Sequence, residues 1–294
     1  MLDFAHIGFH KTGTTWIQKY WFPTQYGILM LKELLKENYA LFNDGFCFAS
    51  SDDFDTKYFR NKITRALNNS TINQGTRRIG WSLEALSGDI FSGKNCYILA
   101  ERLINTFGKI RIVICIRNQP AMINALYCQY IKAGGTLSPN SFLSCPKSPA
   151  KNIFNKLKYN ELISYYISLF GKKNVYLYLY EDFLNNKSEC LSSLAKFIEI
   201  SIAPWNDNIL WNPSLSKPAT AIMRYSNIAC RINPVLNNKI RLKISNYIAM
   251  CDRFHQNKYY YNDKMKNYIK KYYYEYNKSL LPIFNGKLYK YNYL

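Results

Sequence analysis

The stretch from Leu2 to Gln18, LDFAHIGFHKTGTTWIQ, restricts the fold of this chain more than any other. An apolar run with strand character leads into Gly8, the segment Lys11–Thr15 follows, and an amphipathic helix is expected to begin near Trp16. A strand, a glycine-bearing loop and a helix in this order direct unpaired backbone N–H groups and the positive end of the helix dipole at one point. The lysine of the segment adds a mobile positive charge, and its threonines add hydroxyl donors. The stretch therefore predicts a phosphate-binding loop.

The spacing of this loop differs from that of the common nucleoside-triphosphate loop, in which four residues separate two glycines and Lys-Ser/Thr follows. Gly8 and Gly13 have the right separation, but Lys11 precedes the second glycine and Thr14 stands where the lysine is required. A lysine at the front of the loop would reach the ligand from another side. The plainer interpretation of the segment is a helix start that two threonines cap.

A second candidate residue follows the segment Arg77–Glu84, which is typical of a short strand leading into a loop. In open α/β sheets, ligands bind at the carboxyl ends of the strands. Glu84 would then lie near the phosphate loop and could take a proton from an attacking hydroxyl. Two alternatives stay open: Glu84 as a solvated residue of a capping turn, and His10, beside Lys11, as the base.

A third candidate is Arg117, which ends the apolar, β-branched run KIRIVICI at 109–116. Such a run is typical of a strand buried on both faces. The sequence Asn-Gln-Pro at 118–120 then begins a helix, whose amides add to the two donors of the arginine fork. We interpret Arg117 as a second phosphate ligand; the alternative is an ion pair at the helix terminus.

Strand and helix patterns alternate along the chain, which predicts an α/β fold: a three-layer sandwich around a mostly parallel sheet, with a strand-loop-helix phosphate site. We expect helices at 14–25, 27–37, 59–68, 94–107, 118–131, 152–170, 187–198, 218–227 and 263–280, a further strand at 174–180, and loops at 43–55 and 133–149. A single domain is expected over 1–294, with a basic, Tyr- and Lys-rich helical segment at 256–294 packed on it or appended to it.

The Lys-Thr-Gly-Thr-Thr-Trp segment at 11–16 resembles the 5′-phosphosulfate loop of the sulfotransferases that use 3′-phosphoadenosine 5′-phosphosulfate (PAPS). The resemblance covers most of the chain, is sharpest at 6–18 and 111–132, and is greatest to bacterial, carbohydrate-type members. It implies that Lys11 contacts the bridging oxygen and the sulfuryl group. The side chains of Thr14 and Thr15, with loop amides such as those of Thr12 and Gly13, would hold the 5′-phosphate. Trp16 would stack on adenine; the alternative is a core aromatic.

The same resemblance assigns the base to Glu84, since glycan-modifying sulfotransferases commonly carry glutamate at this strand end. It also implies that Arg117 binds the 3′-phosphate together with a serine eight residues on. Ala125 stands at that position here, so one contact of the 3′-phosphate must come from elsewhere. A loop before the helix expected at 218–227 offers Ser214, Ser216 and Lys217, and the alternative is that this loop only caps the helix.

The formal charge of +20 fits attraction for polyanions, such as a nucleotide, an acidic glycan or an anionic membrane face. The plainer interpretation is a compositional bias toward Lys, Asn, Ile and Tyr. No recognisable nucleic-acid module is present, so no nucleic-acid partner is expected. The eight cysteines form no CxxC pair and only three histidines occur, so we expect a reducing compartment and no metal site.

Neither a secretory signal nor an apolar run of eighteen residues is found, which favours a cytoplasmic protein, with peripheral contact to the inner membrane face left open. The whole pattern predicts sulfuryl transfer from PAPS, without a metal, to a hydroxyl or amine of an acceptor, preferably a carbohydrate or polysaccharide. A P-loop kinase or ATPase is the first alternative, and it would need magnesium. A non-catalytic protein that binds polyanions or glycans is the second.

Overall fold

The computed structural model describes residues 1–70, 77–206, 215–232, 248 and 260–294. Its centre is a sheet of five parallel strands in the order β2-β3-β1-β4-β5. The strands are β1 (Phe4–His6), β2 (Ile28–Met30), β3 (Arg78–Ser82), β4 (Arg111–Ile116) and β5 (Val175–Leu179). Because the strands are parallel, all their carboxyl ends meet at one edge, and β1, which enters the predicted phosphate loop, is the central strand.

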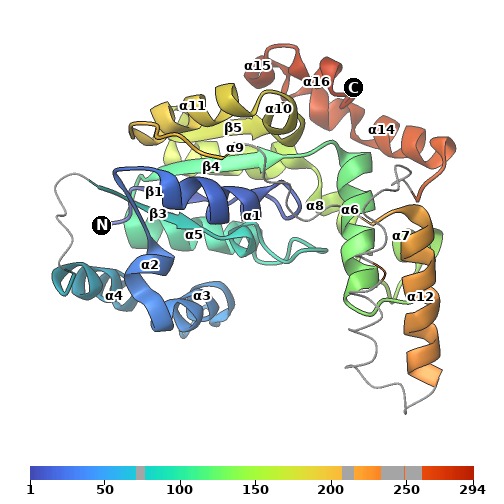
Figure 1. Cartoon of the computed structure of the whole chain (residues 1–294), viewed down its shortest axis with the longest axis horizontal. Helices are drawn as coiled ribbons and strands as arrows, with labels where there is room; N and C mark the ends of the chain where they lie inside the picture. The colour runs from blue at the N-terminus through green and yellow to red at the C-terminus, as the bar shows by residue number, and fades with distance from the viewer. Residues whose placement is uncertain (71–76, 207–214, 233–247, 249–259) are drawn as a thin grey trace.

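Helices cover both faces of the sheet and its carboxyl edge. They are α1 (Thr14–Trp16), α2 (Leu31–Leu35), α3 (Tyr39–Phe48), α4 (Thr56–Asn68), α5 (Cys96–Phe107), α6 (Gln119–Lys132), α7 (Pro139–Ser144), α8 (Ile153–Lys156), α9 (Tyr159–Phe170), α10 (Tyr180–Asn185), α11 (Lys187–Ile198), α12 (Lys217–Ile232), α14 (Asp263–Lys278), α15 (Leu281–Phe284) and α16 (Lys287–Lys290). Figure 1 shows α1 and α11 on one face, α5 and α9 on the other, and α6 and α12 beyond the carboxyl ends of the strands. None of the helices in the described ranges has the length and apolar character needed to cross a bilayer.

Two hydrophobic cores separate these layers, because successive side chains of a strand point to opposite faces. On one face, Ala5 and Ile112 pack with buried residues of α5, α6 and α9. On the other face, Phe4 and Val113 pack with Trp16 and with residues of α11. Strand β4 is thus covered on both sides, as its apolar run predicts. The expected three-layer α/β architecture with a parallel sheet is confirmed.

Several local predictions were wrong, each for a tertiary reason. The first part of the helix expected at 27–37 is the edge strand β2, which pairs with β3 in the register Ile28↔Arg78. The loop expected at 43–55 begins inside α3, whose Phe42 and Phe46 lie one turn apart and both contact the ring of Trp81. The polar residues between them, Asn-Asp-Gly at 43–45, occupy the more exposed side of that helix.

Two further differences concern the segment from 133 to 170. The expected loop at 133–149 contains α7, which Ser138 caps by accepting a hydrogen bond from the Ser141 amide at 3.2 Å, with proline in its first turn. The single helix expected at 152–170 is divided into α8 and α9. The division falls at Leu157 and Lys158, and the side chain of Leu157 is fully buried.

The segment 260–294 packs on the described body through α14, which contacts α6 and α9. Ile269 and Tyr273 are buried on the inward side of α14. Gln119 and Asn277 exchange two amide hydrogen bonds, at 2.7 and 3.0 Å, between the first turn of α6 and the last turn of α14. The expected boundary at 256 lies outside the described residues.

Candidate active site

The loop between β1 and α1 is tightly built and needs glycine at its end. Gly13 has φ +78°, and a Cβ atom there would lie 3.1 Å from the rings of both Tyr180 and Phe183. Gly13 is also the N-cap of α1, and it has no side chain with which to cap this helix start. The helix continues as a π-helical turn over Ile17–Trp21. The simple interpretation of a threonine-capped helix is therefore wrong, and the hydroxyls of Thr12 and Thr14 have other partners.

Substituting Gly13 should destabilise the protein for two reasons: the left-handed backbone conformation and the contact with two aromatic rings. Gly13→Ala places a side chain in the left-handed region and against two rings, whereas Gly286→Ala, at nearly the same backbone angles (φ +78°, ψ −9°), meets no described atom within 4 Å. The left-handed conformation alone costs ~1 kcal/mol. We expect Gly286→Ala to lower the free energy of unfolding by about that amount and Gly13→Ala by roughly 2–3 kcal/mol, because overpacking adds to it. Urea unfolding measures both variants, and equal losses would show that the rings do not constrain Gly13.

Glu84 and the loop meet because β1 and β3 are paired in parallel, with His6 opposite Ser82. Both strands therefore end at the same level, and Glu84 begins a 3₁₀ turn just beyond β3. The hydroxyl of Thr14 donates a hydrogen bond to Oε1 of Glu84. Burial raises the pKa of the Glu84 carboxyl, while the positive charges of Lys11 and Lys156 partly offset this rise. A half-buried carboxylate is thus in contact with Thr14, the first helical residue after the loop.

Lys11 extends from the loop toward α6. Its Nζ donates to Oε1 of Gln129 at 2.6 Å, and burial lowers the pKa of its ammonium group, although Glu84 acts in the opposite direction. Lys11 itself has φ +67°, so the backbone in front of Gly13 is also left-handed. The ammonium group is therefore held between Glu84 and α6, where it can stabilise negative charge that develops on a ligand.

Gln129 was not predicted as a site residue, although the sequence contains a signal for it. Met122, Ala125, Gln129 and Lys132 follow one another at intervals of three and four residues, so they share one face of α6. That face also contains Ala125, the position at which a serine was expected to bind the 3′-phosphate. The charge of Lys132 also lowers the pKa of Lys11, which places the Lys132 end of the pattern near the loop.

Arg117 lies at the end of β4 and turns back toward the loop. Its Nη1 donates to the backbone carbonyl of Lys11 at 3.0 Å, and its guanidinium carbon lies 4.6 Å from the centre of the Tyr180 ring. Its Nε is buried and has no hydrogen-bond partner among the described residues. Within that same part of the chain Arg117 forms no ion pair with a carboxylate, so the ion-pair alternative is not observed. A donor that is buried and unpaired suits an anionic ligand.

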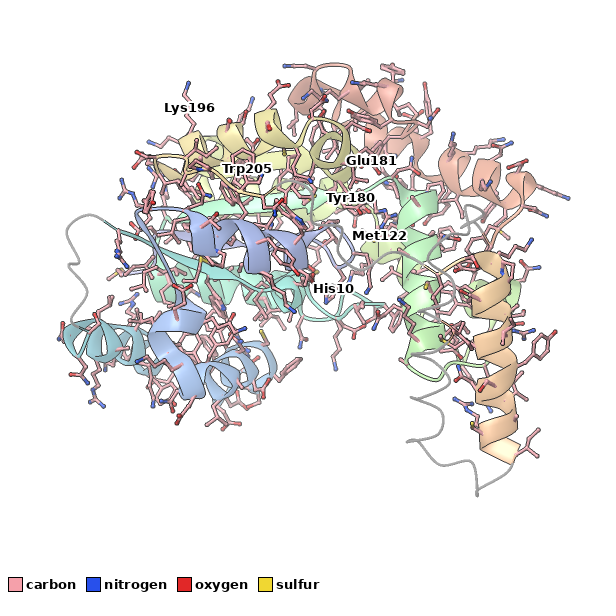
Figure 2. The ribbon with its side chains drawn as sticks, viewed as in Figure 1. His10, Met122, Tyr180, Glu181, Lys196 and Trp205 are labelled. Atoms are coloured by element: carbon pink, nitrogen blue, oxygen red, sulfur yellow. The ribbon has the colours of Figure 1, made fainter. Side chains whose placement is uncertain are left out.

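Residues of the segment 260–294 form hydrogen bonds around Asn118, the residue that follows Arg117. Glu181, directly after β5, accepts hydrogen bonds from the Asn118 amide at 2.9 Å and from the Tyr293 hydroxyl at 2.8 Å. The side-chain amide of Asn118 donates to the carbonyl of Asn292 at 2.7 Å. Figure 2 shows Tyr180 and Glu181 beside the first turn of α6, where Met122 lies. Residues distant in sequence thus hold the junction between β4 and α6 on which Arg117 stands.

His10, the alternative base, is a poor one in this arrangement. Burial is the main cause that lowers its pKa to about 3, and the nearby charges of Lys156 and Lys11 add to it. Its Nδ1 is buried without a partner among the described residues. His10 is labelled in Figure 2, in the loop after β1. A group with so low a pKa accepts a proton less readily than Glu84, whose pKa is raised.

Of the other residues predicted to bind the donor, Thr12 forms a hydrogen bond within the loop and Trp16 packs in the core. The Thr12 hydroxyl donates to the carbonyl of Phe9 at 2.5 Å and so helps to hold the loop in shape, while Thr15 is half-buried. Trp16 is only 5% exposed, and its ring lies 5.6 Å from that of Phe183. This packing favours the core interpretation of Trp16 over stacking on adenine.

The candidates for replacing the missing serine lie near α12. Ser216 is buried, and its hydroxyl accepts a hydrogen bond from the Ala219 amide at 3.2 Å, so it caps α12. Lys217 is the exposed first residue of that helix, and Ser214 lies outside the described residues. Ala125 is buried in α6, with 6% exposure. The capping alternative therefore describes Ser216 in this structure.

Tyr260 connects this loop to α6, which the sequence did not suggest. Its hydroxyl donates to the carbonyl of Leu215 at 2.7 Å, and its amide donates to the side chain of Asn124 at 2.9 Å. Asn124 is adjacent to Ala125, so the residues around Ser216 are attached to the part of α6 where the expected serine is absent. The chain thus brings 215–216 and 124–125 together through one tyrosine.

Comparisons with known proteins agree with this architecture. As a sequence, the chain matches no family model and no curated protein. As a structure, it is similar to a sulfotransferase from Alicyclobacillus acidocaldarius, with a TM-score of 0.52 and 18% identity, over 85% of this chain and 96% of that one. Weaker similarities include the sulfotransferase domain from the curacin biosynthetic pathway (TM-score 0.43, 14% identity, 69% of this chain and 75% of that one). A further one is retinol dehydratase in complex with retinol and PAP (TM-score 0.35, 11% identity, 93% of this chain and 80% of that one).

The similarity to the Alicyclobacillus protein shows that the chain has the fold of the sulfotransferases. Because the sequences are only 18% identical, this similarity extends to the fold and not to the chemistry. What the site does must be argued from its own residues. No cluster of three or more His, Cys, Asp or Glu side chains arranged to hold a metal occurs in the described ranges.

Proposed function

We propose that this protein is a sulfotransferase that moves a sulfuryl group from PAPS to a hydroxyl or amine of an acceptor. The convergence of three separate segments carries the proposal. Lys11 and Thr14 follow β1, Glu84 follows β3 and Arg117 follows β4, and hydrogen bonds connect Thr14 to Glu84 and Arg117 to the Lys11 backbone. A cationic loop, a half-buried carboxylate and the guanidinium fork of Arg117 at one sheet edge match what a phosphosulfate donor and a hydroxyl acceptor require.

The donor end of the site is supplied by the loop and by Arg117. The amides of the loop, with Thr14 and Thr15, would hold the 5′-phosphate, because the left-handed residues Lys11 and Gly13 curve the backbone around one point. Arg117, whose buried Nε has no partner among the described residues, would bind the 3′-phosphate. The serine expected at position 125 has no direct substitute among the described residues, although Asn124 and the 215–216 segment lie beside it.

The acceptor end depends on Glu84. Burial raises the pKa of the Glu84 carboxyl toward neutral pH, and a general base is most effective when its pKa is close to the working pH. Glu84 would take the proton of the acceptor hydroxyl while the acceptor oxygen forms its bond to sulfur. The bond between sulfur and the bridging oxygen breaks, and its electron pair stays on the leaving phosphate. Lys11 would stabilise that developing charge, since preorganised donors are most valuable where charge appears.

The acceptor class is a finer part of the proposal. A carbohydrate or another molecule rich in hydroxyls is supported by the charge of +20 and by the aromatic content of 16%, since aromatic rings stack on sugar faces. Binding to an anionic membrane or polysaccharide would use the exposed lysines of α14, such as Lys264 and Lys271. A kinase or ATPase is disfavoured because Lys11 precedes Gly13 instead of following it.

Calorimetry with 3′,5′-adenosine bisphosphate (PAP) tests the donor. We expect PAP to bind without magnesium and more tightly than ATP with magnesium. Arg117→Ala should weaken PAP binding by ~10–100-fold, because charged hydrogen bonds contribute about 1.5–3 kcal/mol. Arg117→Lys is the matched variant: it keeps the charge but loses the fork, and should recover only part of the affinity. Binding of ATP with magnesium alone would contradict the proposal in favour of phosphoryl transfer, and binding of neither would favour a polyanion-binding protein.

A further inference from the structure

A pocket of about 320 Å³ opens next to the candidate base. It is lined by residues of the loop after β1, of the segment after Glu84, of the first turns of α5 and α9, and of α8, including Phe9, Ser87, Lys156 and Leu162. Both α5 and α9 lead into strands, so their first turns lie at the carboxyl edge of the sheet. Ser87 connects the pocket to the base, because its hydroxyl donates to the backbone carbonyl of Glu84 at 2.8 Å.

The pocket combines three kinds of side chain. Aromatic and aliphatic groups form its wall and rim: Phe9 and Leu162 are buried, whereas Tyr97 and Ile98 are 43% and 41% exposed. Hydroxyl and amide groups line it as well, from Ser87, Ser92, Asn95 and Asn155. Its lining charges are three lysines (Lys94, Lys156 and Lys158) against one carboxylate, Glu161, which is 3.7 Å from Lys158.

Lys156 is the cation that joins this pocket to the catalytic residues. Its stem packs along Gly93, where a Cβ atom would lie 3.1 Å from the lysine Cγ, and its Nζ donates to the carbonyl of Asp89. Its charge influences the pKa values of both Glu84 and His10. Burial lowers the pKa of Lys156 itself to about 8, which leaves it positively charged at neutral pH. Oδ1 of the Asp89 carboxylate accepts hydrogen bonds from the amide and the hydroxyl of Ser92 at 2.7 Å each, and the charge of Asp89 partly offsets the lowering of the Lys156 pKa.

We propose that this pocket binds the acceptor and that Lys156 selects an acidic sugar unit there. This inference rests on the proposed function. A ring surface such as Tyr97 suits the apolar face of a sugar, hydroxyl and amide groups suit its hydroxyls, and a lysine suits a carboxylate or another anionic substituent. The volume lies at the lower end of the range for small-ligand sites, which fits one or two sugar units better than a long segment.

Two aryl glycosides that differ in one group provide the test. 4-Nitrophenyl β-D-glucuronide carries a carboxylate where 4-nitrophenyl β-D-glucoside carries a hydroxymethyl group. Calorimetry with and without saturating PAP should show the glucuronide binding at least tenfold more tightly to the wild-type protein. Lys156→Met keeps the stem but removes the charge, and should abolish this difference. Lys151→Met, at an exposed lysine outside the pocket, should behave as the wild type does.

Equal binding of the two glycosides, no binding of either, or a preference that survives Lys156→Met would overturn the assignment of the pocket. The donor site is tested separately by PAP, whose affinity should change by less than twofold in Lys156→Met. Glycoside discrimination with no PAP binding would refute the proposed sulfotransferase while leaving an acidic-sugar pocket. PAP binding with no discrimination would keep the sulfotransferase and refute this pocket as its acceptor site.

Discussion

Replacing Glu84 by glutamine should lower kcat by ~10²–10⁴-fold, the usual contribution of a positioned general base. Glutamine keeps the size of the side chain and an oxygen that can accept the hydrogen bond from Thr14, so the loop should be undisturbed. PAP affinity should not fall, because the variant removes a negative charge from the neighbourhood of an anionic ligand. Single-turnover transfer from radiolabelled PAPS to the acceptor measures the chemical step directly. Turnover at the wild-type rate would remove Glu84 from the mechanism.

The pH profile adds an independent check of the same residue. A base works only when deprotonated, so kcat/KM should fall on the acid side as Glu84 becomes protonated. Because burial raises the pKa of Glu84, the midpoint of this acid limb should lie above 4.5. Lys156→Met should move the limb to higher pH, since the lysine charge lowers the pKa of Glu84. His10→Gln should keep the limb where it is, whereas its disappearance in that variant would assign the base to His10.

Lys11→Met is expected to have the second large effect, a loss of ~10²–10³-fold in kcat, because Lys11 would stabilise the negative charge on the leaving phosphate. Methionine retains the long unbranched stem and introduces no new steric group at the left-handed position, where φ is +67°. The loss should appear in kcat more than in PAP affinity, because charge on the bridging oxygen grows only as the bond to sulfur breaks.

Lys32→Met, at an exposed lysine of α2, is the matched control for a change in overall charge and should be active at the wild-type level. A Lys11 variant with unaltered kcat but much weaker PAP binding would show that the lysine binds the ground state only. An equal loss of kcat in Lys11→Met and Lys32→Met would show that both losses come from the change in the protein's net charge. Either result would require another group for the leaving oxygen.

The sheet and the meeting of the three site segments could be predicted because both depend on local patterns. The apolar, β-branched run KIRIVICI predicts a strand from its composition alone. Arg117 follows it directly, and a residue in that position lies at the carboxyl edge of a parallel sheet. Glu84 follows from the same argument applied to β3, whose register with β1 places their ends together. The structure brings Lys11, Glu84 and Arg117 to one place as expected, and their roles in chemistry stay predictions.

The supporting residues could not be predicted, because each is chosen by a tertiary contact. Gln129 reaches Lys11 across 118 positions, and Tyr293 reaches Glu181 across 112, without a motif in either segment. Lys156 falls within the single helix expected at 152–170, whereas the structure ends α8 at Lys156 and packs its stem beside Gly93. Sequence patterns such as period and capping describe neighbours along the chain, whereas these contacts depend on how α6, α8 and α14 pack.

The attachment of α14 and Tyr293 to the junction after β4 also bears on how the protein is made. The hydrogen bonds between Gln119 and Asn277 and between Asn118 and Asn292 span 158 and 174 positions. During synthesis the central strands are available long before these partners leave the ribosome, and contacts of such wide separation form late. A nascent chain stalled before residue 277 would have its phosphate loop in place while Arg117 lacked its rear support. Completion of the anion site thus coincides with the last stage of translation of this segment.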